Sequence, residues 1–246
     1  MSQTATPAQA APSGAPAPAP VPPASGHDGF PLVLRGVSKR WHKSSTLVLD
    51  GVDLELDIGS RTWVGGRNGA GKTTLLRIAA GLIDPDRGRA TVWGFGPHER
   101  RSRYHQLVAF LPAGDRGLYA RLTVRRQLAF WAAIAKLDRE VAARRVEAAL
   151  DDFDLRGLAD HRVDRMSMGQ RQRLRIALAF LPEPETVLLD EPLTSLDAEG
   201  AELLGAALDR LTDRGGALLW ASPSGDHPDL SFDHDWFLED GGLTRV

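Results

Sequence analysis

Nine consecutive residues of this chain have the composition of a phosphate-binding loop. They fit the pattern G-x-x-x-x-G-K-[ST] at every fixed position. They are Gly66, Arg67, Asn68, Gly69, Ala70, Gly71, Lys72, Thr73 and Thr74. Glycines allow positive φ, so successive N–H groups can point at phosphate oxygens, and the N-terminus of a following helix adds partial positive charge. Lys72 would reach the β- and γ-phosphates and the Thr73 hydroxyl would bind Mg²⁺. The loop predicts binding of a nucleoside triphosphate, rather than a glycine-rich turn that binds nothing.

A second group of candidate residues follows the apolar segment 186–189, where Asp190 and Glu191 stand side by side. A buried strand can deliver a carboxylate to a Mg²⁺ ion beside the phosphate loop, and Asp190 has the place for it. Glu191 points elsewhere and would polarise a water molecule in line with the γ-phosphate. The alternative is a buried strand that simply ends in two solvated acids. In an α/β chain with a phosphate loop upstream, the catalytic interpretation is favoured.

Alternating strands and helices are needed to bring these two groups together. Residues 61–65 predict a strand before the loop, and residues 75–80 a helix after it. Further strands are expected at 32–37, 46–58, 89–93, 186–189 and 217–221, and helices at 124–137, 139–153, 168–181 and 198–212. Thr123 and Asp138 are expected N-caps. Acids alternate with apolar Val52, Leu54, Leu56 and Ile58, as in an antiparallel strand with one wet face. The pattern predicts an α/β fold with a mostly parallel sheet, antiparallel strands at its N-terminal side and a helical insert.

Composition limits the other possibilities. The 246 residues carry 30 basic and 32 acidic side chains, which gives no reason to expect nucleic acid as a partner. No cysteine is present, and the longest apolar run, Leu128–Ala135, is far shorter than the ~20 residues of a membrane span. Residues 1–28 are rich in alanine and proline and are expected to be a disordered tail, with a proline-recognition ligand as the alternative. Residues 29–246 are expected to form one domain.

Three further segments carry a resemblance to a known family. Arg165–Arg173, which contains Ser167, Gly169 and Gln170, resembles the L-S-G-G-Q signature of ABC (ATP-binding cassette) ATPases. Ser195–Asp197 matches the D-loop of that family, and Trp41 has the place of its adenine-stacking aromatic residue. The alternative for Trp41 is a core residue of a β region, and the alternative for Ser167 is a plain helix cap.

The resemblance, which runs from about residue 32 to 245, implies a fold and a set of partners. The fold is a P-loop NTPase core with a helical subdomain inserted at about 114–166. The activity is ATP hydrolysis with Mg²⁺, in which Lys72 and Glu191 are catalytic and Thr73 and Asp190 hold the metal. A second ATP-binding subunit, expected to be another copy of this chain, would close a head-to-tail dimer through Ser167, Gly169, Gln170 and Asp197. The other partner is an integral-membrane permease, which would hold this chain at the cytoplasmic face of the membrane. Residues 114–124 resemble export-type subunits.

Two positions depart from the family pattern. Where the family has a glutamine that touches Mg²⁺ and the attacking water, this chain has Ala113. Where it has a switch histidine, this chain has Pro223, and His227 could replace it only if the loop is rebuilt. Hydrolysis is therefore expected to be slow. The alternatives are a weakly hydrolysing or regulatory cassette, or a soluble ABC ATPase that serves no transporter.

Overall fold

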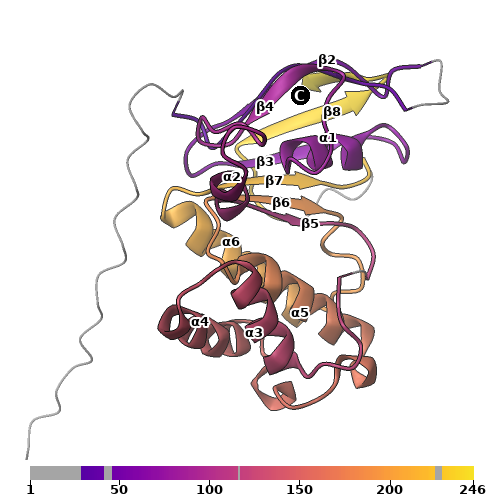
Figure 1. Ribbon diagram of the computed structural model, residues 1–246. Coiled ribbons are helices and arrows are strands. Elements are labelled where there is room, and N and C mark those ends of the chain that lie inside the picture. The colour runs from indigo at the N-terminus through magenta and orange to yellow at the C-terminus, as the bar shows by residue number, and fades with distance from the viewer. Residues whose placement is uncertain (1–28, 42–45, 116, 225–228) are drawn as a thin grey trace, which may run out of the picture.

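The computed structural model, which describes residues 29–41, 46–115, 117–224 and 229–246, contains a six-stranded sheet (Figure 1). Its strands, in spatial order, are β5 (Val108–Leu111), β6 (Thr186–Asp190), β7 (Ala217–Ala221), β3 (Arg61–Gly65), β8 (His234–Glu239) and β9 (Gly242–Arg245). All neighbours are parallel except β8 and β9. The predicted α/β fold with a mostly parallel sheet is confirmed. The carboxyl ends of β5, β6, β7 and β3 lie at one edge of the sheet, which is where ligands bind in open α/β sheets.

A second sheet of three antiparallel strands lies over the first (Figure 1). Its order is β2 (Leu49–Leu56), β1 (Leu32–Lys39) and β4 (Arg87–Thr91). Val52, Leu54 and Leu56 point into the core as their alternation predicts. The extension of that pattern to Ile58 is wrong: β2 ends at Leu56, the chain turns at Asp57–Ser60, and Ile58 is 59% exposed.

The helices are divided between the two faces of the larger sheet (Figure 1). Helices α1 (Lys72–Ala79) and α2 (Arg101–Leu107) share a core with the smaller sheet. On the other face lie α5 (Met168–Phe180) and α6 (Ala198–Asp213), and beyond them α3 (Val124–Ile134) and α4 (Arg139–Asp152), with 3-10 turns at Arg156–Leu158 and Val163–Arg165. No described helix is long and apolar enough to cross a membrane. The division of the chain into a tail and one domain stays a prediction, since residues 1–28 lie outside the described part.

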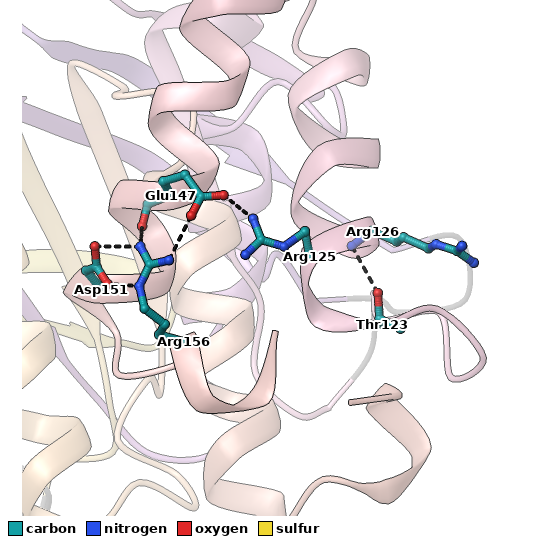
Figure 2. A network of polar contacts seen from close by, with 6 residues as sticks. All are labelled: Thr123, Arg125, Arg126, Glu147, Asp151 and Arg156. Atoms are coloured by element: carbon teal, nitrogen blue, oxygen red, sulfur yellow. Dashed lines mark hydrogen bonds and ion pairs between the residues drawn. The ribbon is translucent and has the colours of Figure 1, made fainter. Parts of the chain in front are cut away.

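A network of charged side chains joins the start of α3 to α4 (Figure 2). Glu147 of α4 forms ion pairs with Arg125 of α3 and, at 2.8 Å, with Arg156, which also binds Asp151. Hydrogen bonds from Arg156 and then Arg125 lower the pKa of Glu147. At the same end of α3, the Thr123 hydroxyl accepts a hydrogen bond from the Arg126 N–H, so Thr123 is the predicted cap. These ion pairs are exposed, so they add little to the stability of the fold.

Candidate nucleotide-binding site

The phosphate loop connects β3 to α1, as predicted, and close approach of other backbone atoms requires glycine at two of its positions. Gly71 has φ 111°, and a Cβ there would lie 2.8 Å from the Val48 carbonyl oxygen. At Gly66 a Cβ would lie 2.5 Å from the Leu238 carbonyl oxygen. Helix α1 begins at Lys72 rather than near Leu75, so the loop delivers the chain directly into the helix. The helix N-terminus therefore lies within the loop, where its N–H groups and dipole suit an anion.

Lys72 is buried and lies across the loop. Its ammonium group donates to the carbonyl oxygens of Gly66 at 2.7 Å and Arg67 at 3.1 Å. Burial lowers the pKa of Lys72, and the negative charges of Glu191 and Asp190 oppose that shift. An ammonium ion held at the centre of a loop of N–H donors favours a polyanionic ligand.

Thr73 and Asp190 meet at the carboxyl edge of the sheet. The Thr73 hydroxyl donates to Asp190 Oδ2 at 2.8 Å, and Asp190, at the end of β6, is 1% exposed. Burial raises the pKa of Asp190, while hydrogen bonds from Thr73 and the Ala113 backbone N–H and the charges of Lys72 and Arg77 lower it. A hydroxyl and a buried carboxylate are hard oxygen donors of the kind that Mg²⁺ takes together with phosphate oxygens. The residues present therefore fit the expected metal. The hydrogen bond between Thr73 and Asp190 brings together two donors that are 117 positions apart in the chain.

Glu191 lies in the tight turn that follows β6. It has φ 49°, a conformation costly for a residue with a side chain, and its N–H donates to Ala221 O at 2.8 Å. That bond ties the turn after β6 to the end of β7, two residues before Pro223. The Glu191 side chain is partly exposed, and its negative charge acts on the buried Lys72.

The two positions that depart from the family pattern lie at this same edge. Ala113 follows β5 and is exposed, and its backbone N–H lowers the pKa of Asp190. Pro223 follows β7 and is partly buried. Their side chains offer no polar group to a phosphate. His227 lies outside the described residues.

Ser167 and its neighbours form a separate group at the start of α5. The Ser167 hydroxyl accepts from the Gln170 N–H at 3.2 Å, and the Gln170 side chain accepts from the Ser167 N–H at 2.9 Å, so the predicted cap is a capping box. Asp197 caps α6 through the Gly200 N–H. Gly169 lies against the D-loop, since a Cβ there would lie 3.3 Å from Ser195 O. The signature and the D-loop thus meet at the start of α5. Helix α5 lies on the opposite face of the larger sheet from α1 (Figure 1).

Trp41 is not a core residue, because its side chain is 43% exposed. The Lys39 ammonium lies 5.9 Å from its ring centroid. Asp86 accepts hydrogen bonds from the Lys39 ammonium at 2.9 Å and from the Arg40 N–H at 2.7 Å, and so holds the chain just before the ring. An exposed, tethered ring is suited to stacking.

Several residues at the site were not predicted. Trp63 of β3 donates from Nε1 to Ser222 Oγ at 2.8 Å, which links the strand before the loop to the residue before Pro223. Gln172 and Arg175 of α5 contact the turns after β6 and β5. Each of these contacts joins residues that are far apart in the chain. The one local indication was the presence of polar residues on a helix face that must pack against the sheet.

Comparison with known proteins places these features in context. Residues 49–194 match the family model described as ABC transporter. The chain is 32% identical over 193 residues to the ABC transporter ATP-binding protein NatA of Bacillus subtilis (strain 168), covering 78% of each chain. It is 34% identical over 167 residues to the Fe(3+) ions import ATP-binding protein FbpC of Vibrio cholerae serotype O1, covering 68% of this chain and 46% of that one. A solved structure described as an ATP binding subunit of an ABC transporter is similar with a TM-score of 0.80 and 25% identity, covering 87% of this chain and 89% of that one.

Proposed function

The chain belongs to the ABC transporter family, and on that premise we propose that it binds and hydrolyses ATP as the ATP-binding subunit of a membrane transporter. The observation that carries the proposal is the hydrogen bond between Thr73 and Asp190, because it joins the phosphate loop to the acidic strand at one point. The names of both relatives, which call them ATP-binding proteins, support the same activity.

Each residue of the site has a definite task in this proposal. Trp41 stacks on adenine, and the N–H groups of residues 66–74 surround the phosphates. The Lys72 ammonium group, which donates to loop carbonyl oxygens in the structure, donates to β- and γ-phosphate oxygens when ATP is bound. Thr73 and Asp190 hold Mg²⁺, which when bound neutralises charge on the phosphates. Glu191 accepts a proton from the attacking water.

A second copy of the chain completes the site in this proposal. Ser167 is exposed, and since a hydroxyl both accepts and donates, it can keep the Gln170 N–H and still donate to a phosphate oxygen. Gly169 and Gln170 place the N-terminus of α5 at the same surface, and Asp197 holds the adjacent D-loop. The proposed arrangement is a head-to-tail homodimer, in which the signature of one copy faces the phosphate loop of the other.

The membrane partner is proposed to dock in a groove between β5, α3 and α5. The cavity has a volume of about 650 Å³ and its lining includes Leu118, Trp131, Ile134 and Leu178. Tyr119 and Phe130, in contact with each other, add exposed aromatic surface nearby. A cytoplasmic helix of a permease fits such a groove through its apolar face, and it would hold this chain at the inner face of the membrane. The resemblance of residues 114–124 supports export, although FbpC is named for import.

Capture of a membrane partner tests the transporter role. Tagged full-length protein, extracted with mild detergent, is expected to copurify with a multi-spanning membrane protein, which mass spectrometry would identify. Ile134→Glu should lose that partner, because a carboxylate in a desolvated apolar groove costs several kcal/mol.

Ile58→Glu is the matched control, since Ile58 is 59% exposed and Ile134 52%, and Ile58 does not line the groove. The control should keep the partner, and both variants should bind ATP as the wild type does. Equal loss from both variants would contradict docking in the groove.

Ala113 and Pro223 favour a slow enzyme as the finer proposal. A preorganised donor at a transferring phosphoryl group typically contributes about 10²–10³ in rate. Pro223→His is therefore expected to raise steady-state phosphate release, if the turn accepts the added N–H. Ala113→Gln should help less alone than in the double variant, because groups acting on one transition state are not additive.

The control for this series is nucleotide affinity, which should stay within about twofold because the loop is untouched. Fast release by the wild type that collapses in His227→Ala would show that His227 serves as the switch, and the assignment of that place to Pro223 would be wrong.

A further inference from the structure

Arg175 lies in the interior of the molecule, with its guanidinium aimed at the turn after β5. It is 4% exposed. One terminal nitrogen donates to the Pro112 carbonyl oxygen and the other to the Gly114 carbonyl oxygen. The planar fork of the guanidinium suits two acceptors set a fixed distance apart. Arg175 therefore fixes the peptide groups on both sides of Ala113.

The turn held in this way reaches the proposed metal site. Because Leu111 of β5 pairs with Leu189 of β6, Ala113 lies next to Asp190, and its N–H lowers the pKa of that carboxyl group. The Thr73 hydroxyl donates to the same carboxylate. The turn itself is exposed from Ala113 to Asp115, and Gly114 has φ 86°, so its own side chains contribute little to its conformation. The direction of the Ala113 N–H thus depends on the two carbonyl groups that Arg175 holds.

Gln172 extends the same contact to the turn after β6. Its Oε1 accepts from Arg175 at 2.5 Å, and its Nε2 donates to Pro192 O at 2.8 Å. Pro192 follows Glu191 directly. One face of α5 therefore holds both turns that carry polar groups to the site.

On the basis of the proposed function, in which Asp190 holds Mg²⁺, we propose that Arg175 is a positioning residue for ATP hydrolysis. Its guanidinium connects α5, the helix that Ser167 begins, to the Asp190 carboxylate through the Ala113 N–H. Contacts that orient a metal ligand typically change metal affinity or activity by about 10–100-fold when they are removed. A shift of α5 on closure of a dimer would reach the metal ligand through this path.

Burial of Arg175 has a cost that a purely structural role could avoid. Loss of hydration lowers the pKa of Arg175, and only the nearby charge of Asp115 opposes that shift. An apolar side chain would fill the space without that cost. That apolar side chain would, however, leave the carbonyl oxygens of Pro112 and Gly114 without the donors that Arg175 provides.

The test compares Arg175→Met, which keeps the length of the side chain, with a matched arginine elsewhere. Arg214 also has its pKa lowered by burial, and it also donates to a proline carbonyl oxygen, that of Pro184 at the opposite end of β6. Arg214→Met therefore removes a similar contact away from the site. For full-length wild type and both variants, phosphate release is measured as a function of Mg²⁺ and ATP, and ATP affinity is measured in EDTA.

Arg175→Met is expected to need about 10–100-fold more Mg²⁺ or to lose the same factor in kcat. Its ATP affinity in EDTA should stay within about twofold. Arg214→Met should match the wild type in all three measurements, although both variants lower Tm by a few degrees. Wild-type Mg²⁺ dependence and kcat in Arg175→Met, or equal losses in both variants, would overturn the inference.

Arg175→Lys keeps the charge but cannot span both carbonyl oxygens, and it carries the test if Arg175→Met does not fold. It should show a smaller loss of the same kind, and a wild-type Mg²⁺ dependence would overturn the inference. A wild type that binds no ATP would overturn the proposed function itself, and this inference with it. The two failures are therefore distinguishable.

Discussion

Lys72→Ala is expected to weaken ATP binding by about 100-fold, because a hydrogen bond to a charged group is worth about 1.5–3 kcal/mol and each 1.4 kcal/mol is a factor of ten. The ammonium group of Lys72 is buried and already bonded to Gly66 O and Arg67 O, so its position needs little rearrangement for a phosphate. Calorimetric titration would give the affinity. A thermal shift assay would give the same information, since ATP at 100 times its Kd adds about 2.7 kcal/mol of stability to a protein that binds it.

Two further variants make this result specific. Arg77→Ala also removes one positive charge from α1, but Arg77 is exposed in the last turn of the helix. The ATP affinity of this variant should therefore stay within about threefold of the wild type. Trp41→Ala should lose about tenfold, the lower part of the range for one base on one aromatic ring. Equal ATP affinity in Lys72→Ala and the wild type would refute the assignment of residues 66–74 as the phosphate site.

Glu191→Gln is expected to reduce ATP hydrolysis by about 10²–10⁴, the usual contribution of a general base. ATP and Mg²⁺ binding should persist, because Lys72, Thr73 and Asp190 are unchanged. The amide has nearly the shape of the carboxylate, so the tight turn at φ 49° should also persist. With hydrolysis blocked, the protein should accumulate as dimers that retain ATP, which light scattering coupled to gel filtration would detect.

Glu202→Gln, an exposed acid on α6, provides the control and should hydrolyse ATP as the wild type does. If Glu191→Gln stays strictly monomeric at saturating Mg-ATP, with and without membrane partner, the head-to-tail dimer is wrong. If it hydrolyses ATP at the wild-type rate, the role of Glu191 as the base is wrong.

The parts of the site that depend on residues close together in the sequence were predictable. Glycine spacing predicts the phosphate loop because the backbone geometry of residues 66–71 is local. The helix caps at Thr123 and Ser167 are also local, and both are confirmed. Asp190 was expected beside the phosphate loop because it ends an apolar strand of an α/β chain, and in the structure it accepts a hydrogen bond from the Thr73 hydroxyl. The catalytic roles stay predictions.

Features that depend on distant partners were not predictable. The hairpin of β8 and β9 was missed although its turn contains Asp240-Gly241, because β8 is half-buried along most of its length and shows no clear alternation. Helix α2, seven residues long, is too short for a clear period. Arg175 reaches carbonyl groups more than 60 positions away in the chain, and nothing in its own neighbourhood indicates them.

The interleaving of the two sheets along the chain has a consequence for folding. In chain order, β1 and β2 come first, then β3 and α1, and only then β4, which pairs with β1 to complete the smaller sheet. That pairing closes a long loop, whose entropy must be recovered from non-local contacts. The apolar side chains of α1, which lie in the core that this helix shares with the smaller sheet, supply such contacts. The smaller sheet is therefore complete only when β4 packs with α1, the helix that follows the phosphate loop.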